Sequence, residues 1–455
     1  MHLVNFGDAP RGFSRSVTHL LVGVVTIAVA SRIAAQTPAP SPVPREAVLL
    51  GTVLGAVERA NPRLDAARAT ARAARARVPG VTRPPDPQLQ IGWMNYELPN
   101  LRPMDAIGMT QLQLMQMVPV AGKLRLAGLA ESARADASAT RVAGVSFDLR
   151  ERASMAFYDI YTVDGTLGVA RDTRRLLQDI GDIASKMYQV GEGRQADVLR
   201  ANVELARMQE DIIRMETMRT TMTARLNALL AESPDAPVGE PRLPRFPAEL
   251  PALDSLTRLA EQNRPMLRAG AQDVDAADAA ARLAQREIWP DLQMGVQYGQ
   301  QPGPNGAQRM GSLMVAASLP IFAKSRQFQM REEADAMHAM AVSDLASMRA
   351  ETRGAVGEAH ASLVRARRLA ELYRTSVLPQ AEATVTSSLA SYRVGTVNFM
   401  TLLDAQMTLN RYRQELFTLE AEEGKAWADL EMLTGCVLVD AHTAQPARPA
   451  GGPSK

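Results

Sequence analysis

Two pairs of segments alternate apolar residues with small or polar ones at a period of two. The first pair lies at residues 87–118 and the second at residues 290–320. One face of each segment carries mainly leucine, valine, methionine or aromatic residues, and the other carries mostly glutamine, glycine and small residues. This period predicts β-strands with one apolar face. A half-buried sheet would show the same alternation, but few other apolar segments exist to cover these strands, and lengths of about ten residues suit a tilted bilayer crossing.

Strands that cross a bilayer impose a condition on the whole assembly. Backbone groups in lipid must find partners within the protein, so membrane strands close into a barrel without an edge. Four strands are too few to close one. We therefore expect copies of the chain to share a barrel of about eight, twelve or sixteen strands, for a dimer, trimer or tetramer.

A helical period surrounds each strand pair. Two segments, roughly Lys123 to Gln189 and Lys324 to Ser391, each predict a helix of about 67 residues and about 100 Å. A medium helix is expected before each strand pair and after each long helix, so that two medium helices lie end to end beside a long one. Apolar residues at alternating spacings of three and four predict coiled-coil seams between antiparallel helices. The seam positions are Val198, Ala201, Leu205, Met208, Ile212 and Met215 in the first half, and Leu402, Ala405, Leu409, Tyr412, Leu416 and Leu419 in the second.

The chain repeats the same order of elements after about 203 residues. Leu89-Gln-Ile-Gly92 recurs as Leu292-Gln-Met-Gly295, and the turn sequence Tyr188-Gln-Val-Gly191 recurs as Tyr392-Arg-Val-Gly395. Such internal similarity indicates a duplication. The predicted organisation is a signal peptide at 1–35, a proline-rich linker at 36–47, a first repeat at 48–231 with its turn at 189–196, a proline-rich linker at 232–253, a second repeat at 254–435 with its turn at 393–400, and a flexible tail at 436–455.

Charge and targeting signals narrow the function classes. The 51 basic and 49 acidic residues are spread along the chain, so we expect no nucleic-acid partner. Arg11 and Arg15 precede an apolar run at residues 20–30, which together with Ala35 predicts a secretory signal peptide; an uncleaved anchor is the alternative. No later run approaches the roughly 20 apolar residues that a spanning helix needs. A membrane crossing must therefore use the strands.

Candidate chemistry is sparse. The single cysteine, Cys436, excludes an intrachain disulfide framework and a multi-cysteine metal cage. No nucleophile, base and orienting group occur at a recognisable spacing, and no phosphate loop is present, so we predict neither enzymatic activity nor a cofactor. The 23 methionines would suit a soft metal, but Met208 and Met215 lie on the predicted seam, where packing explains them. We predict no resident metal site.

With the duplicated strand pairs, the seams and the two Tyr-x-Val-Gly turns, residues 46–435 resemble the TolC-type outer membrane factor family of tripartite efflux systems. The resemblance implies a mixed α and β membrane protein, in which long antiparallel helical hairpins form a trimeric α-barrel. A twelve-stranded outer-membrane β-barrel, four strands per protomer, continues it. The protein would be an outer-membrane exit duct with a large periplasmic portion. It would passively conduct substrates from an inner-membrane pump, for which the resistance-nodulation-division type is a candidate, and a periplasmic adaptor.

The resemblance also implies roles for individual residues. The two turns are expected at the periplasmic tips, where Leu199 and Leu403 would lock each turn onto its hairpin. Pro119 and Pro320 are expected at strand-to-helix junctions, and Gln116 to Lys123 resembles the junction of the heavy-metal branch of the family. The implied adaptor-contact residues are Tyr188, Val190, Gly191, Leu199, Tyr392, Val394, Gly395 and Leu403.

The implied aperture residues are Asp197, Thr401 and Asp404, and they depart in part from the family pattern. Thr401 stands where relatives often carry an acidic residue, and Val397 stands where a basic residue is expected to help hold the aperture closed. Asp197 would bond to Tyr392 in that role, and Asp404 would form a ring of negative charge in the lumen. For both aspartates the alternative is a solvated carboxylate in a first helical turn, favoured by the helix dipole.

Two other function classes fit part of the pattern. A periplasmic adaptor also has a long hairpin, but normally one, placed inside β-rich domains. A structural coiled coil of the cell envelope would leave the strand alternation unexplained. The sequence leaves the transported substrate open between metal cations and drugs or other organic compounds.

Overall fold

The computed structural model describes residues 47–97, 99–100, 102–104, 108–303 and 306–443. The predicted signal peptide, all but the last residue of the first linker, and the final twelve residues lie outside the described part. The first repeat contains α1 (Leu50–Ala60), α2 (Pro62–Val81), β2 (Gln88–Met94), β5 (Met109–Val118), α3 (Lys123–Gln189) and α4 (Gln195–Leu230). The second contains α5 (Leu253–Asn263), α6 (Pro265–Arg286), β7 (Leu292–Gly303), β8 (Gly306–Ala317), α7 (Gln327–Leu372), a π-helical turn (Tyr373–Val377), α8 (Leu378–Arg393) and α9 (Phe399–Thr434).

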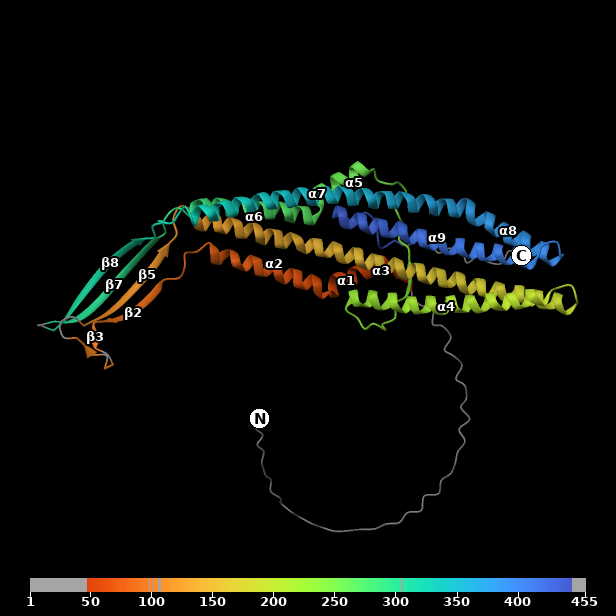
Figure 1. The fold of residues 1–455 in the computed structure, drawn as a ribbon, viewed down its shortest axis with the longest axis horizontal. Helices are drawn as coiled ribbons and strands as arrows, with labels where there is room; N and C mark the ends of the chain where they lie inside the picture. The colour runs from red at the N-terminus through yellow and green to blue at the C-terminus, as the bar shows by residue number, and fades with distance from the viewer. Residues whose placement is uncertain (1–46, 98, 101, 105–107, 304–305, 444–455) are drawn as a thin grey trace, which may run out of the picture. The chain divides into compact units, whose positions relative to one another are not determined.

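Helix α3 packs against other helices on two sides. Toward the sheet its neighbours are α2 and α6, and toward the hairpin turn they are α4 and α9 (Figure 1). Helix α7 packs against α6 near the sheet and against α9 farther along, and α8 also packs against α9. Two shorter helices therefore lie end to end beside each long one, as the predicted helix lengths indicated. Among the helices that the structure describes, none combines the length and the apolar character needed to cross a bilayer.

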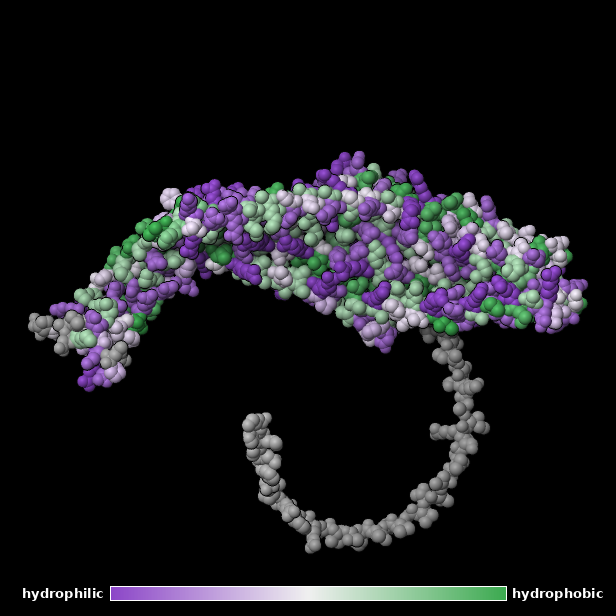
Figure 2. Space-filling view, viewed as in Figure 1, coloured by the Kyte–Doolittle hydropathy of each residue, from purple (hydrophilic) through white to green (hydrophobic). Residues whose placement is uncertain are grey.

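The four long strands form one antiparallel sheet in the order β2-β5-β7-β8. Strand β5 pairs with β7 so that Leu112 lies opposite Tyr298 and Val118 opposite Leu292. The apolar residues at alternate strand positions remain exposed. In Figure 2, hydrophobic residues lie along the β8 side of the sheet and continue to the turns that follow β8. Two-residue strands β3 (Tyr96–Glu97) and β4 (Arg102–Pro103) form a separate antiparallel pair in the chain between β2 and β5, which the sequence pattern did not predict.

The predicted medium helices before the strands are each broken in two. Pro62 and Pro265 occupy the first turns of α2 and α6. A proline inside a helix lacks the N–H donor and costs about 3 kcal/mol or more, so the chain ends one helix and starts another. Asn61 caps the new helix by accepting a hydrogen bond from the Arg63 N–H at 3.0 Å, and its amide donates to the Leu229 carbonyl at 2.8 Å.

The second long helix differs from its prediction. It begins at Gln327 instead of Lys324, and the π-helical turn separates α7 from α8. Within that turn the Leu378 N–H bonds to the Tyr373 carbonyl, directly before Pro379, which has no N–H to donate. Even so, Gln327 to Arg393 covers 67 residues, the same length as α3.

The second proline-rich linker and the start of the C-terminal tail pack onto the helices. Strand β1 (Ala47–Leu49) pairs in parallel with β6 (Glu240–Arg242) inside the linker. The prediction of a flexible tail is wrong for residues 436–443. Val439 is buried, and the Glu431 carboxylate accepts hydrogen bonds from the Leu438 and Val439 N–H groups at 2.8 and 2.9 Å. The apolar run from Val437 to Val439 explains why the start of the tail packs against the helices.

A carboxyl group in the middle of α3 is held partly out of water. Burial raises the pKa of Glu151, and the charges of Asp429 and Asp148 add to the rise against the opposing charge of Arg152, which brings it to about 7. Burial also raises the pKa of Asp429 on α9. Ionisation of both groups therefore places like charges at the contact between α3 and α9.

Glu151→Gln is expected to raise the thermal midpoint by a few degrees at pH 8 and by much less at pH 5. The folded-state pKa lies above the ordinary value of 4.5. The neutral carboxyl therefore contributes stability fully below about pH 4.5, and that contribution is lost as the pH rises through about 7. Circular dichroism during heating in detergent measures the midpoints. Glu332→Gln, at an exposed position of α7, is the control, and equal shifts at both pH values would contradict the assignment.

Candidate functional site

The two hairpin turns have the same backbone geometry. The Gly191 N–H bonds to the Tyr188 carbonyl at 3.1 Å, and the Gly395 N–H bonds to the Tyr392 carbonyl at 3.0 Å. Both glycines have positive φ, at 81° and 73°, which only glycine adopts without steric cost. The next N–H in each turn also bonds back to an equivalent carbonyl, that of Met187 or Ser391. Each long helix therefore ends in the same glycine-dependent reversal.

The side chains of the two turns are placed differently. Tyr188 is 47% exposed but Tyr392 only 5%, and Leu199 is 58% exposed but Leu403 only 4%. Within a single chain, Leu403 is therefore packed beside its turn, whereas Leu199 is not. Val190 and Val394 are both largely exposed beside the glycines.

Tyr392 lies in an apolar core that the two hairpins share. Its ring meets that of Phe399 edge to face, with centroids 5.8 Å apart. The same cluster contains buried residues of α3, α4 and α9, so the hairpins are joined near their turns. Burial raises the pKa of the Tyr392 hydroxyl, and the charge of Asp197 raises it further. The structure thus brings Asp197 near Tyr392, while Asp197 also occupies the first turn of α4. The cluster is formed by Leu167, Ala170, Leu177, Ile180, Ala184, Ala201, Met208, Ile212, Tyr392, Phe399, Leu402 and Leu403.

Thr401 belongs to the cap of α9. Its N–H and its hydroxyl both bond to the Asn398 side-chain oxygen, at 2.9 and 3.0 Å. The hydroxyl is therefore engaged in helix initiation. Asp404, about one turn farther along the same helix, is exposed to solvent.

The junction at Pro119 contains a buried lysine whose role the sequence did not reveal. The Lys123 ammonium donates to the Trp289 carbonyl and to Asp291, each at 2.9 Å, and lies 3.4 Å from Glu287. Its side chain is 7% exposed. Lys123 therefore ties the first residue of α3 to the segment before β7, which joins the two repeats. Because these partners lie 164 to 168 residues away in the sequence, no local spacing predicts the contacts.

The junction at Pro320 is not an equivalent of the first. Lys324, the sequence counterpart of Lys123, is exposed, and so are Ile321 and Phe322. Residues 321–326 form turns before α7 begins. Matching sequences at the two junctions therefore do not give matching contacts.

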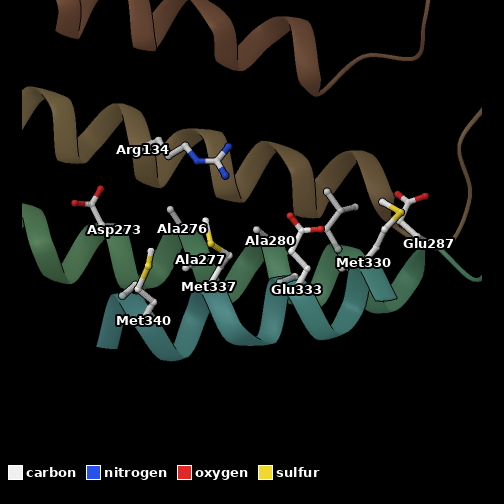
Figure 3. Close-up of a pocket in the computed structure, with 14 residues that line it drawn as sticks. Arg134, Asp273, Ala276, Ala277, Ala280, Glu287, Met330, Glu333, Met337 and Met340 are labelled. Atoms are coloured by element: carbon white, nitrogen blue, oxygen red, sulfur yellow. The ribbon is translucent and has the colours of Figure 1, made fainter. Parts of the chain in front are cut away.

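A cavity of about 430 Å³ lies between α6 and α7, with Arg134 of α3 at its rim (Figure 3). Alanines of α6 face Met330, Met337 and Met340 of α7 across it. Within the described ranges, no group of three or more histidine, cysteine, aspartate and glutamate side chains is placed to hold a metal ion. The cavity is an apolar groove between neighbouring helices.

Comparison with known proteins adds to this geometry. Residues 256–436 match the family model described as outer membrane efflux protein. This part of the chain is therefore similar to the outer membrane efflux proteins. The match runs from within α5 to the residue after Gly435, which caps α9, so it covers the second repeat.

Individual proteins similar to this chain agree with the match. The cobalt-zinc-cadmium resistance protein CzcC of Cupriavidus metallidurans is 24% identical over 309 residues, covering 67% of this chain and 72% of that protein. The solved structure of CusC has a TM-score of 0.74 at 17% identity, covering 85% of this chain and 92% of that one. VceC of Vibrio cholerae has a TM-score of 0.73 at 16% identity, covering 86% and 96%. The structural likenesses show that the chain has the fold of these outer-membrane proteins.

Proposed function

We propose that this chain forms the outer-membrane exit duct of a tripartite efflux system and passively conducts substrates to the exterior. The main observation behind this proposal is that the apolar residues at alternate positions of the sheet are exposed. The sheet is followed directly by helical hairpins whose turns lie at the opposite end of the helices (Figure 1). A sheet of this kind suits a bilayer and long hairpins suit the periplasm. The match of residues 256–436 to the outer membrane efflux protein model supports the same location and role.

The duct is proposed to be a homotrimer. Strands β2 and β8 are the edges of the sheet in a single chain, and an edge in lipid leaves backbone groups without partners. Pairing of β8 in one copy with β2 in the next removes every edge, and three copies give a barrel of about twelve strands. The long helices would continue the same ring as an α-barrel.

The two turns are proposed as docking points for a periplasmic adaptor, which would link the duct to an inner-membrane pump of the resistance-nodulation-division type. Val190 and Val394 are exposed beside tight glycine turns. Each copy therefore offers two apolar tips of equal backbone shape. Their shared geometry supports recognition by one kind of adaptor hairpin.

Divalent metal cations are the proposed cargo, because CzcC is named for resistance to cobalt, zinc and cadmium. A strain lacking the chain is expected to become more sensitive to salts of these metals, and expression of the chain should restore tolerance. Growth inhibition by the metals and by a panel of organic antimicrobials measures both. If the strain became sensitive to organic compounds alone, the proposed cargo would be wrong and organic compounds would take its place. Unchanged tolerance of both metals and organic compounds would contradict the efflux role.

Fractionation tests the location separately. The chain should remain with outer membranes after carbonate washing and be released by detergent. Recovery in the soluble periplasm without detergent would contradict the duct and favour an adaptor or a structural coiled coil.

Asp404→Asn is expected to weaken the cation preference of the reconstituted channel. Three exposed copies of Asp404 would concentrate negative potential where the lumen narrows. The reversal potential across a planar bilayer under a salt gradient measures the preference. Glu415→Gln, about three turns farther from the aperture on the same helix, is the control. Equal shifts for the two variants would contradict an aperture at Asp404.

A further inference from the structure

Methionine is distributed unevenly between the two faces of the four-stranded sheet. Strands β2, β5, β7 and β8 contain seven methionines, and antiparallel pairing puts directly opposite residues on the same face. Six of the seven lie on the face that carries most of the glutamines and glycines, and Met294 lies on the other. The six are Met94, Met109, Met115, Met117, Met310 and Met314.

No other large apolar residue accompanies these six methionines in the four strands. Every leucine, isoleucine, valine and aromatic residue of the strands lies on the opposite face, which is proposed to face lipid. The methionine face otherwise carries glutamine, glycine, serine and alanine. Leucine or valine would supply apolar area equally well, so the exclusive use of methionine points to its sulfur.

The methionine face is the inner face of the proposed barrel. Glutamines at the centre of this face are half-buried, whereas the apolar residues of the opposite face are exposed. Side chains crowd in this way on the concave face of a sheet that curves toward closure. The Gln297 amide donates to the Gln111 side-chain oxygen at 2.5 Å across the strands. In the closed barrel the methionines of each copy would therefore line the lumen.

Two of the methionines approach each other above a glycine. Gly295 is paired with Met115 on β5 and with Met314 on β8. The position that a Cβ on Gly295 would occupy lies 3.3 Å from the Met115 Cγ and 3.7 Å from the Met314 Cε. In methionine both of these carbons are bonded to the sulfur. The missing side chain of Gly295 therefore leaves an open position with a thioether on either side.

A similar arrangement recurs at Gly299. The Met109 sulfur lies 2.9 Å from the position of a Cβ on Gly299, and Met310 is directly opposite that glycine on β8. Met109 is also paired with Met94 on β2. At about 3.4 Å per residue, the methionines from Met109 to Met117 extend over roughly 27 Å of strand. The thioethers therefore form a series along the inner face.

This ligand set selects a class of cation. Thioether sulfur is a soft, uncharged donor that suits Cu(I), and Ag(I) shares this preference. On the inner face of the four described strands there is no aspartate, glutamate, histidine or cysteine. Zinc and cobalt would find none of their usual charged or imidazole ligands on it. A monovalent cation also loses less hydration energy than a divalent one when uncharged ligands replace water.

Resting on the exit duct proposed above, we propose that the inner face of the sheet binds the soft monovalent cations Cu(I) and Ag(I) as cargo in transit. Met115 and Met314 beside Gly295 form the principal site, and the other four methionines form further sites along the lumen. These cations would be carried in addition to the divalent metals. Methionine has three rotatable bonds, so a thioether can follow a passing cation without movement of the strands.

Silver binding tests the principal site, because Ag(I) stays monovalent without a reductant. The full chain, purified in detergent, carries Cys436→Ser to remove its single thiol and is titrated with silver nitrate in chloride-free buffer. Isothermal titration calorimetry measures the affinity, and X-ray absorption at the silver edge identifies the ligand atoms. We expect silver to be bound through sulfur. Met115→Leu with Met314→Leu should weaken the tightest site by about tenfold or more.

Met294→Leu is the matched control, because Met294 lies on the opposite face of β7. Leucine is close to methionine in volume, so these variants should keep the fold and the assembly. Circular dichroism and native mass spectrometry check both. Equal silver affinity in the double variant and the control, or silver bound without sulfur ligands, would overturn the site.

A second variant tests the open position while keeping both sulfurs. Gly295→Val would place a branched side chain between Met115 and Met314 and should also weaken silver binding. Gly311→Val is its control, because Gly311 lies on the outer face of β8 with open space around a Cβ. Unchanged silver affinity in Gly295→Val would overturn the assignment of the principal site.

Growth assays separate this cargo from the duct itself. A strain lacking the chain should be inhibited by less silver nitrate, and the wild-type chain should restore tolerance. A variant with all six inner-face methionines replaced by leucine should restore tolerance of zinc but not of silver. Sensitivity to divalent metals with unchanged silver tolerance would overturn this inference and leave the duct standing. Unchanged tolerance of all metals and organic compounds would contradict the duct, and this cargo with it, even where purified protein binds silver.

Discussion

Replacing both turn glycines by valine, Gly191→Val with Gly395→Val, is expected to reduce export to the level of a strain lacking the chain. Their φ angles of 81° and 73° lie in the left-handed region, where a residue with a Cβ costs about 1–2 kcal/mol and a β-branched residue is a rare outlier. Open space surrounds the added Cβ at both positions, so the cost falls on the backbone of the turns. The backbone of both turns should change conformation. An adaptor that recognises the native conformation of the turns should then no longer bind.

Metal tolerance of the complemented strain measures export of the proposed cargo, and native mass spectrometry checks that the proposed trimer still assembles. Gly168→Val with Gly354→Val is the matched control. Both of these glycines are helical and exposed, have open space around a Cβ and lack positive φ. Full tolerance in the turn variant, at normal abundance, would show that the adaptor does not depend on the shape of the tips.

Lys123→Met should produce the largest loss of stability of any single change in the junctions. Removing one partner of a buried ion pair typically costs about 3–5 kcal/mol. Here Asp291 and Glu287 are 27% and 33% exposed, so water compensates in part, and we expect a cost of about 2–3 kcal/mol. The Trp289 carbonyl would also lose its donor.

Thermal unfolding followed by circular dichroism measures the cost. Lys324→Met removes the sequence counterpart, whose side chain is exposed, and should change the midpoint little. Equal loss in the two variants would mean that the midpoint reports lysine charge in general, and not the contact between the repeats.

The long helices, the strand pairs and the hairpin turns were predictable because each has a local signal. Heptad spacing, period-two alternation and a glycine after an apolar helix act over a few residues. The breaks at Pro62 and Pro265 also had a signal, and the prediction overlooked it by extending one helix through a proline. The π-helical turn before Pro379 is another consequence of a missing N–H.

The contacts of Lys123 and the different burial of Tyr188 and Tyr392 could not be read from local sequence. Lys123 finds its partners in the other repeat. The two tyrosines occupy the same motif and the same backbone geometry. Their exposure differs because of which helices one chain supplies around each turn, a property of the tertiary arrangement and not of the motif.

The core shared by the two hairpins near their turns would determine how many parts move if the proposed aperture opens and closes. A ring of six single repeats would have six equal boundaries, and each repeat would be free to move by itself. In the proposed trimer, joining the repeats in pairs would leave three rigid bodies to move. Fewer independent parts lower the entropy that must be lost to reach one closed arrangement, so the duplication itself favours a gate that opens and closes as a unit.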